Sequence, residues 1–411
     1  MRIWHLTKTL YGGAGQYVLR LSNALNSLGY QSTVLVAEGE IIAGVNNLSP
    51  QTNTLQSFLN RGLISMINRT VKAPFHSGYR LDRWKTNTSI KHSDIVHLHG
   101  MTGWVGFSGL RHLIPPQTKV FWTAHDLWML SGGCVVYIGC NNYQSGCQSC
   151  PVLKHPFSNW SKHEWRYKAK FIKDYKITPI ANSQWTANQI RESGFFSDLE
   201  NIAIVPPIVA SEFFEADSLP SLREELGLPA DRIILGLGAR TITDQYKGIP
   251  EFLERFSQEL DLVDRCTLVI CGDGELDVSP SLDCRFLGAF TKPEELARFY
   301  CACDVFISPS KMETFGMTLL EAQAAGTPVV AFRVGGTPEA VRHLEYGYLA
   351  AQNDYGEIIS GLKWILSNLQ NTRDMGINSS AWVKANFSSQ VIAMKQANIK
   401  NYSYNSYSLS Y

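Results

Sequence analysis

The stretch that decides the fold covers residues 304–340 and reads DVFISPSKMETFGMTLLEAQAAGTPVVAFRVGGTPEA. It contains two apolar runs, at residues 305–307 and 328–332, that are typical of buried strands. The segment between them, residues 317–325, predicts a helix. A strand, a helix and a strand in this order form a parallel unit, and ligands bind beside the carboxyl ends of such strands. The sequence therefore predicts a ligand site at this edge of a parallel sheet.

Two glutamates and a pair of glycines fall at the predicted edge. Glu313 lies in the loop before the helix, Glu321 lies within the helix, and Gly335-Gly336 follow the second strand. An ionised carboxylate only accepts hydrogen bonds, so both glutamates suit the hydroxyls of a sugar or a ribose. The structural alternatives are an exposed helix charge for Glu321 and a capping role for Glu313.

The alternation of strand and helix patterns continues along the whole chain. It predicts an α/β fold with parallel sheets that helices cover on both faces. Pro206-Pro207 interrupt regular structure near the middle, so we place a boundary there between domains 1–206 and 207–387. A last helix near residues 388–411 is expected to pack back on the first domain. The other strands are predicted at residues 3–6, 33–37, 94–98, 120–123, 178–181, 201–205, 233–237, 267–270 and 285–287.

The composition is that of an ordinary globular protein. Its 411 residues include 37 Lys+Arg against 36 Asp+Glu, a formal net charge of +1, whereas nucleic-acid-binding domains are usually strongly basic. No run of about 18 apolar residues indicates a transmembrane helix, and the N-terminus lacks the pattern of a signal peptide. We therefore expect a cytoplasmic protein with no nucleic-acid partner.

Two cations follow the strand predicted at residues 233–237. Arg240 and Lys247 lie in the loop GARTITDQYKG, which the end of that strand places at the ligand edge. A departing diphosphate gathers negative charge, and an arginine fork with a lysine point charge suits it. Two solvated loop charges are the alternative, and the position at a strand end disfavours it.

The N-terminal half offers a glycine loop and a histidine at similar positions. Residues 11–15 read YGGAG and stand between a strand and a helix, where backbone amides can approach a phosphate. The third glycine of the dinucleotide motif is absent, so a tight turn without a ligand is the alternative. His125 and Asp126 follow the strand at residues 120–123, which suits either a hydrogen bond to a sugar hydroxyl or a structural role.

Four of the nine cysteines lie in one short segment. Close cysteines in a cytoplasmic protein favour a structural Zn²⁺ site over disulfides. The spacing does not match a zinc ribbon, so disulfides and free thiols stay as alternatives. Because the segment follows His125, we expect it to shape the part of the ligand site next to that residue. The four are Cys134, Cys140, Cys147 and Cys150.

Two basic stretches, at residues 61–85 and 154–176, lie in the proposed N-terminal domain. The second interleaves its cations with Trp160, Trp165 and other aromatic residues. Basic and aromatic residues together suit an anionic membrane surface, which predicts peripheral attachment to the inner face of the membrane. A solvated charged face is the alternative.

The motifs together resemble those of a retaining family 4 glycosyltransferase of GT-B fold, of the exopolysaccharide or capsule type. The resemblance implies two Rossmann-like domains that face each other across a cleft, with the acceptor on the first domain and the donor on the second. Its most specific element is the pair of glutamates separated by seven residues. The motifs are GGAG near the start, AHD at 124–126, GAR…KG at 238–248, CGDGE at 271–275, and ETFGMTLLEA with the downstream GTPEA.

The resemblance also assigns roles to residues of this chain. Arg240 and Lys247 would hold the donor diphosphate, Glu313 would contact the donor sugar, Glu321 would bind the ribose, and His125 would touch the transferred sugar. The family commonly has glycine where this chain has Thr314. The implied catalytic residues are His125, Glu313, Arg240 and Lys247. The implied donor-binding residues are Gly13, Gly15, Arg240, Lys247, Leu287, Glu313, Thr314, Phe315, Gly316 and Glu321.

The implied reaction moves a hexose from a nucleotide-diphosphate sugar to a hydroxyl of a glycan or lipid-linked acceptor in polysaccharide biosynthesis. The departing phosphate can take the acceptor proton, so no hydrolase-type pair of carboxylates is needed. Closure of the domains would exclude water. The resemblance implies no catalytic metal ion, which leaves structural zinc as the expected cofactor.

Three other functions fit parts of the pattern. An epimerase of the same fold would act on the nucleotide sugar without an acceptor. The cysteine segment and the two basic stretches, which lie on the acceptor side, weigh against it. A non-catalytic subunit that binds nucleotide sugars would be expected to lack Glu313, His125 or the cations. A nicotinamide-dependent dehydrogenase is disfavoured by the incomplete glycine motif.

Overall fold

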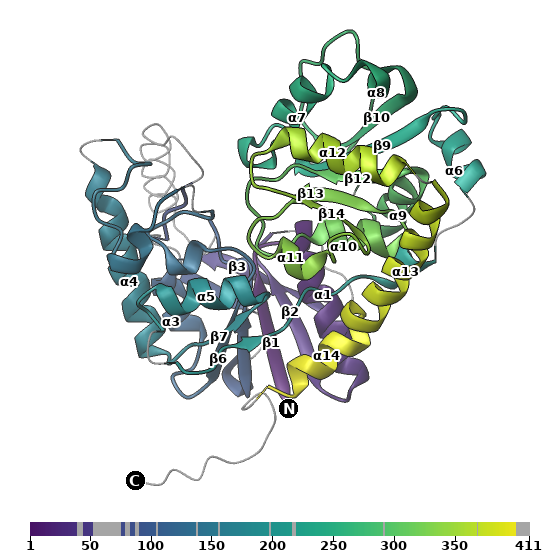
Figure 1. Cartoon of the computed structure of the whole chain (residues 1–411). Coiled ribbons are helices and arrows are strands. Elements are labelled where there is room, and N and C mark those ends of the chain that lie inside the picture. The colour runs from purple at the N-terminus through teal and green to yellow at the C-terminus, as the bar shows by residue number, and fades with distance from the viewer. Residues whose placement is uncertain are drawn as a thin grey trace. The chain divides into compact units, whose positions relative to one another are not determined.

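The chain forms two compact α/β units. The computed structural model describes residues 1–38, 44–51, 75–78, 83–86, 90–103, 106–136, 139–154, 157–196, 199–215, 219–290, 292–367 and 369–399. One unit comprises Met1–Pro206 together with the segment that begins at Ala393, and the other comprises Pro207–Ile392. Figure 1 shows the sheet of each unit with helices packed against it. Within the described residues, no helix is both long enough and apolar enough to cross a membrane.

The sheet of the first unit has the strand order β4-β3-β2-β1-β5-β6-β7-β8. All neighbouring strands are parallel except β3 and β4, which pair antiparallel at the edge. Its helices include α1 (Gly12–Ser27), α3 (Phe107–Leu113), α4 (Trp160–Asp174) and α5 (Gln184–Glu192). Its strands are β1 (Arg2–Thr7), β2 (Gln31–Val36), β3 (Val45–Gln51), β4 (Arg83–Thr86), β5 (Ile95–Leu98), β6 (Lys119–Ala124), β7 (Thr178–Ala181) and β8 (Ala203–Ile204).

The sheet of the second unit is parallel throughout, in the order β11-β10-β9-β12-β13-β14. Its strands are β9 (Ile233–Thr241), β10 (Cys266–Asp273), β11 (Cys284–Gly288), β12 (Val305–Ser308), β13 (Val329–Phe332) and β14 (Gly347–Ala350). The helices from this part of the chain are α6 (Leu219–Glu225), α7 (Ile249–Phe256), α8 (Leu260–Arg265), α9 (Pro293–Ala302), α10 (Met317–Ala324), α11 (Thr337–Ala340), α12 (Tyr355–Leu366), α13 (Leu369–Phe387) and α14 (Ser389–Ala397).

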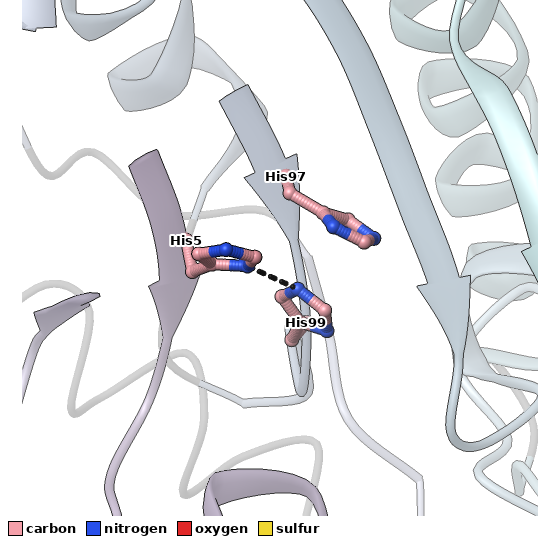
Figure 2. Close-up of side chains that lie close together, drawn as sticks. All are labelled: His5, His97 and His99. Atoms are coloured by element: carbon pink, nitrogen blue, oxygen red, sulfur yellow. Dashed lines mark hydrogen bonds between the residues drawn. The ribbon is translucent and has the colours of Figure 1, made fainter. Parts of the chain in front are cut away.

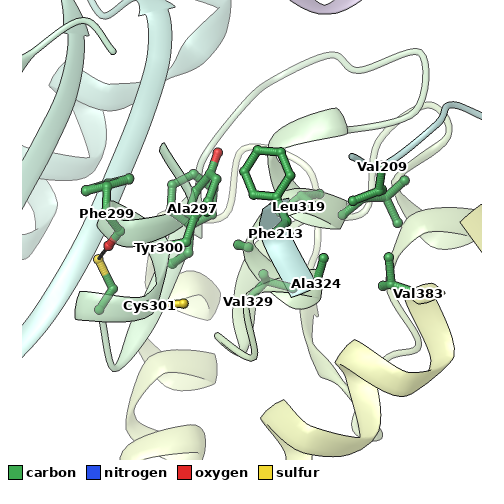
Figure 3. Close-up of a cluster of buried hydrophobic side chains, with 14 of the residues drawn as sticks. Val209, Phe213, Ala297, Phe299, Tyr300, Cys301, Leu319, Ala324, Val329 and Val383 are labelled. Carbon is green, nitrogen blue, oxygen red and sulfur yellow. Dashed lines mark hydrogen bonds between the residues drawn. The ribbon is translucent and has the colours of Figure 1, made fainter. Parts of the chain in front are cut away.

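Side chains of β12 and β13 show why this sheet is covered on both faces. Along β12, Phe306 packs into one hydrophobic cluster, whereas Val305 and Ile307 pack into another. Successive side chains of a strand point to opposite faces, so an uninterrupted apolar strand needs cover on both. Figure 3 shows the first cluster, whose members include Phe299 and Tyr300 of α9 and Leu319 of α10.

The α/β class with parallel sheets is confirmed, and three strands were missed. β3 is interrupted by polar residues, β14 has only four residues, and β4 pairs antiparallel with β3 at the edge of the first sheet. The helical pattern at residues 380–400 belongs to two helices. Ser388 separates them because it forms a β-bridge with Val209. Residues 61–74 and 79–82 of the first basic stretch, and the last residues from 400 onward, lie outside the described residues.

Candidate functional site

Three loops meet at the carboxyl edge of the second sheet, one each after β9, β12 and β13. Lys247 lies in a short 3₁₀ turn, Gln245–Lys247, in the loop after β9, and Glu313 lies in the loop after β12. The Nζ atom of Lys247 donates to Oε1 of Glu313 over 2.7 Å. The structure therefore brings together two of the residues predicted for the donor site, although 66 positions separate them in the chain.

The loops after β9 and β12 pack backbone against backbone. The amide of Lys311 donates to the carbonyl of Tyr246 over 2.7 Å. Gly248 has φ +67°, and a Cβ atom built on it would lie 2.2 Å from the carbonyl oxygen of Pro309. This approach excludes any larger residue, so glycine at position 248 fixes the turn that carries Lys247 beside the loop of Glu313.

The loop after β13 packs against the backbone carbonyl group of Glu313. The amide of Gly336 donates to the carbonyl of Glu313 over 3.0 Å. Gly335 has φ +53°, and a Cβ atom on it would lie 1.8 Å from the same carbonyl oxygen. The downstream glycine pair thus determines the path of the glutamate loop.

The ion pair with Glu313 keeps the half-buried Lys247 positively charged. Burial alone would lower the pKa of Lys247, but the carboxylate of Glu313 and the neighbouring Tyr246 outweigh it and raise that pKa above its usual value. Lys247 is therefore protonated at neutral pH and can receive an anion. Arg240, near the end of β9, is exposed and makes no ion pair with any of the described residues.

Helix α10 begins beside Glu313 and carries the second glutamate. Gly316 caps the helix in a left-handed conformation with φ +104°, and Phe315 before it is buried. Glu321 is buried on α10, so the alternative of an exposed helix charge is wrong. Burial, and then the charge of Glu321, raise the pKa of Tyr300, which places the two side chains close together. Leu287 and Gly288 end β11 at the same edge of the sheet, because β11 runs parallel to β10.

In the first unit, the glycine loop forms the beginning of α1. Gly12 and Gly13 are exposed, and α1 carries no acidic residue in its first turn. A Cβ atom on Gly15 would lie 2.3 Å from the carbonyl oxygen of Thr9, so this position requires glycine. Exposed glycines at the start of a sixteen-residue helix suit an anion, and phosphate binding at this loop stays a prediction.

His125 ends a chain of three hydrogen-bonded histidines that the sequence reasoning missed. His99 Nδ1 lies 3.0 Å from Nε2 of His125, and His99 Nε2 lies 3.1 Å from Nδ1 of His5. Figure 2 shows His5 of β1 and His99, the residue directly after the neighbouring β5, reaching toward each other. Tyr17 of α1 packs edge-on against His125, with 4.8 Å between ring centroids, and so connects the helix of the glycine loop to this group.

The hydrogen bonds determine which ring nitrogen carries the proton in His5, His99 and His125. His5 Nε2 is fully buried and has no hydrogen-bond partner among the described residues. We assign it the lone pair, because a buried N–H without an acceptor loses a full hydrogen bond. His5 Nδ1 then donates to His99 Nε2, and His99 Nδ1 donates to His125 Nε2. His125 therefore carries its proton on Nδ1.

A fourth histidine, His97, completes the buried group. Ligand nitrogens of His5, His97 and His99 lie within 4.8 Å of one another, a grouping able to hold a metal ion. However, His97 Nε2 already bonds Thr123 Oγ1 over 2.8 Å, and the other two rings bond each other. We therefore interpret the group as a hydrogen-bonded network. The signal in the sequence was His97 and His99 at spacing two on a buried strand, which places both side chains on one face.

Burial of four neutral imidazoles predicts that acid destabilises the first unit. Burial lowers the pKa of His5 to about 3 and of His125 to about 4, and it places the pKa values of His97 and His99 well below 6.5. Above pH 6.5 the rings are neutral whether the protein is folded or unfolded. Below it, only the unfolded chain takes up their protons, so each ring should cost about 1.4 kcal/mol of stability per pH unit.

Chemical denaturation at pH 7.5, 6.0 and 5.0, followed by tryptophan fluorescence, measures this effect. We expect stability to fall steeply between pH 6.0 and 5.0, with about four extra protons bound on unfolding. Asp126, whose pKa burial raises, acts in the opposite direction, because the folded protein binds its proton more readily than the unfolded chain does. Replacing the exposed His163 by asparagine should leave the profile unchanged. A stability that stays constant from pH 7.5 to 5.0 would contradict the assignment of buried neutral rings.

The second basic stretch forms α4, and its aromatic residues point inward. Trp165 Nε1 donates to the carbonyl of Tyr143 over 2.9 Å, and Phe171 is fully buried. The exposed surface of the helix carries cations such as Arg166 and Lys173. Of the aromatic residues in this stretch, Phe171 is therefore buried and Trp160, Trp165 and Tyr167 are half-buried, whereas the cations named above are exposed.

Comparison with known families gives two matches along this chain. A model described as Glycosyltransferase Family 4 matches residues 11–213. A model described as Glycosyl transferases group 1 matches residues 232–368. The first match covers the glycine loop, the cysteine segment and three of the four buried histidines, namely His97, His99 and His125. The second covers Lys247, Glu313 and Glu321.

The curated relatives match part of the chain. D-inositol 3-phosphate glycosyltransferase of Stackebrandtia nassauensis is 35% identical over 176 residues, which are 38% of this chain and 39% of that protein. D-inositol 3-phosphate glycosyltransferase 1 of Catenulispora acidiphila is 35% identical over 204 residues, or 44% and 48% of the two chains. The match thus spans less than half the length of these relatives.

Solved structures match the fold over nearly the whole chain. Sucrose-phosphate synthase from Thermosynechococcus elongatus has a TM-score of 0.69 at 20% identity, covering 97% of this chain and 98% of that one. Anabaena HepE, solved in complex with UDP-glucose, has a TM-score of 0.66 at 17% identity, covering 96% and 98%. At these identities the likeness shows the fold alone.

Proposed function

Because this chain belongs to the family 4 glycosyltransferases of GT-B fold, we propose that it is a retaining glycosyltransferase. It moves a sugar from a nucleotide-diphosphate sugar to a hydroxyl of a glycan or lipid-linked acceptor in polysaccharide biosynthesis. The observation that carries this proposal is the pair of Lys247 and Glu313, held by three loops at the carboxyl edge of one sheet.

The ion pair supports separate roles for its two members, with Lys247 binding the diphosphate and Glu313 binding the sugar. When the donor binds, its diphosphate takes over the charge of Lys247, and the released Glu313 accepts hydrogen bonds from sugar hydroxyls. Arg240, exposed at the end of β9, adds a second positive group for the diphosphate. Fixed cations stabilise the anionic charge that develops as the nucleotide departs, without rearrangement at that moment.

His125 supplies a hydrogen-bond donor for the sugar in this proposal. Its Nε2 accepts from His99 in the tautomer assigned above, which leaves the proton on Nδ1 and fixes the orientation of the ring. Burial lowers the pKa of His125 to about 4, so the ring is neutral at pH 7. A neutral ring does not repel the positive charge that develops on the sugar when the nucleotide departs. The departing phosphate takes the acceptor proton, so the reaction needs no second carboxylate as a base.

The acceptor is the finer part of the proposal. The names of the curated relatives give D-inositol 3-phosphate as their acceptor, so an inositol phosphate belongs beside glycans and lipid-linked sugars in any acceptor screen. The exposed cations of α4 support a peripheral position at an anionic membrane, where a lipid-linked acceptor would lie. Neither the matched family models nor these relatives are named as epimerases, and the epimerase alternative is not favoured.

A panel of nucleotide-diphosphate sugars tests the proposal in two steps. At about a hundred times its dissociation constant, the correct donor should stabilise the protein by about 2.7 kcal/mol, seen as a rise of several degrees in the unfolding midpoint. Incubation of that donor alone should then give slow hydrolysis with retained anomeric configuration, read by NMR. A changed sugar still attached to the nucleotide would indicate an epimerase, and no shift with any donor would contradict the proposal.

A further inference from the structure

A small cavity beside α4 gathers the four cysteines of the segment at residues 134–150. Its volume is about 40 Å³, and Cys134, Cys140, Cys147 and Cys150 all line it, together with Ser161 of α4 and other residues. A single water needs about 10–15 Å³, so the space takes an ion together with its ligand sulfurs drawn inward. None of the nine cysteines, all of which the structure describes, forms a disulfide.

The four thiols are close enough to influence one another. Cys134 and Cys150 are hydrogen-bonded to each other. That bond, then burial, and then the proximity of Cys147 and Cys140 raise the pKa of Cys134. Four cysteines around one cavity match the number of ligands that a tetrahedral metal ion takes. No three of these four described sulfurs lie within 4.8 Å of one another in the structure, so binding requires the sulfurs to move inward.

Backbone amides point at the sulfur atoms. The amide of Gly132 donates to Sγ of Cys147 over 3.1 Å. The amides of Val152 and Leu153 donate to the sulfur of Cys150. A thiol is a weak acceptor, so amides directed at sulfur are of most use when the sulfur is a thiolate bound to a metal.

The segment is fixed in a conformation that costs free energy. Cys147 and Ser149 have φ values of +54° and +49°, a left-handed region that is unfavourable for residues other than glycine. Ser161 Oγ donates to the carbonyl of Cys147 over 2.6 Å, and the buried Lys168 donates to the carbonyl of Ser131 over 3.0 Å. These contacts hold the turns that present the sulfurs to the cavity.

We propose that Cys134, Cys140, Cys147 and Cys150 bind one Zn²⁺ ion as a structural site. Four sulfur ligands favour zinc or iron among the metals of proteins, and zinc is typical where all four positions are closed and no redox chemistry is required. The buried cation of Lys168 lies near Cys147 and offsets part of the negative charge of a four-thiolate site.

The site would also stabilise the segment next to His125. The amide of Leu127 donates to the carbonyl of Val135 over 3.1 Å, so the residue after Cys134 is tied to the chain just beyond His125 and Asp126. Loss of the ion should therefore loosen the acceptor side of the first unit. This inference concerns metal binding by the protein and does not depend on the proposed sugar transfer.

Elemental analysis of the full-length protein, purified under reducing conditions and dialysed against metal-free buffer, tests the proposal. We expect about one zinc per chain. Cys147→Ser and Cys150→Ser should each lose it, whereas Cys284→Ser, a half-buried cysteine on β11, should keep it. Cobalt in place of zinc should give the intense near-ultraviolet absorption of thiolate-to-cobalt charge transfer.

A second measurement covers variants that fail to fold. Titration of the wild-type protein with an organomercurial should release the zinc in step with modification of four thiols, recorded with a metal-sensitive dye. Protein that contains no zinc while the four thiols react freely, that contains iron instead, or that carries the four cysteines as disulfides would overturn the proposal. Each of these outcomes leaves the donor site in the second unit untouched, so it would not bear on the proposed function.

Discussion

Replacing Glu313 by alanine should reduce sugar transfer by about 10²–10³-fold while the protein stays folded. The variant removes the carboxylate that accepts hydrogen bonds from the donor sugar. The same carboxylate positions Lys247, whose Nζ lies 2.7 Å from Oε1 of Glu313. Lys247→Ala should cause a similar or larger loss, because it removes the charge that compensates the departing diphosphate. Initial rates with saturating donor and acceptor, together with circular dichroism of each variant, measure both parts of this expectation.

The stability of these variants should change little compared with their activity. The side chains of Lys247 and Glu313 are 19% and 17% exposed, so removing one partner should cost about 1–3 kcal/mol. A matched control is Lys363→Ala, which breaks the pair of Lys363 and Glu259 on the second unit, at a helix end away from the candidate site. That control should transfer sugar at the wild-type rate. Wild-type transfer by Glu313→Ala or Lys247→Ala would show that the site assignment is wrong.

The substitution Gly335→Ala should reduce transfer about a hundredfold, although position 335 carries no chemical group. Its Cβ atom would lie 1.8 Å from the carbonyl oxygen of Glu313, and real contacts of this kind are at least 3.0 Å, so the atoms must separate by 1.2 Å (3.0 minus 1.8). A displacement of about 1 Å in a positioned catalytic group can cost about 10²-fold in rate. Kinetics of the variant at several donor concentrations would measure the loss.

Gly227→Ala separates this steric effect from backbone strain. Gly227 also has a left-handed conformation, with φ +65° against +53° for Gly335, and no atom lies within 4 Å of an added Cβ. Both variants should lose about 1–2 kcal/mol of stability from the positive φ. Only Gly335→Ala should also lose transfer, because only there does the methyl group press on the loop of Glu313. Equal activity in the two variants would mean that the glycine pair does not position the glutamate.

The parts of the fold that follow from periodicity could be predicted from the sequence. The apolar runs at residues 305–307 and 328–332 are buried on both faces, and such runs have few alternatives to a parallel strand. β4 and β14 could not be found in this way. β4 pairs antiparallel with β3, a contact between segments distant in the chain, and β14 is a four-residue strand that begins with glycine.

For the candidate site, too, the local sequence predicted the positions of single residues but not the contacts between segments that are distant in the chain. The strand ends placed Lys247 and Glu313 at one edge, but their contact depends on Gly248 and Gly335 packing against carbonyl groups of other loops. Hydrogen bonds between His5, His99 and His125 join strand β1 to the residues that directly follow β5 and β6, and no single segment contains that pattern. The close packing of α4 against the sheet likewise decided that its aromatic residues face inward.

A crystal structure of the protein with an intact nucleotide-diphosphate sugar, chosen from the thermal-shift panel, tests the central claim most directly. We predict that a diphosphate oxygen lies within hydrogen-bond distance of Lys247 Nζ, that Arg240 faces the same diphosphate, and that the carboxylate of Glu313 accepts from hydroxyls of the sugar. A donor bound with its diphosphate away from Lys247 and its sugar away from Glu313 would contradict the account.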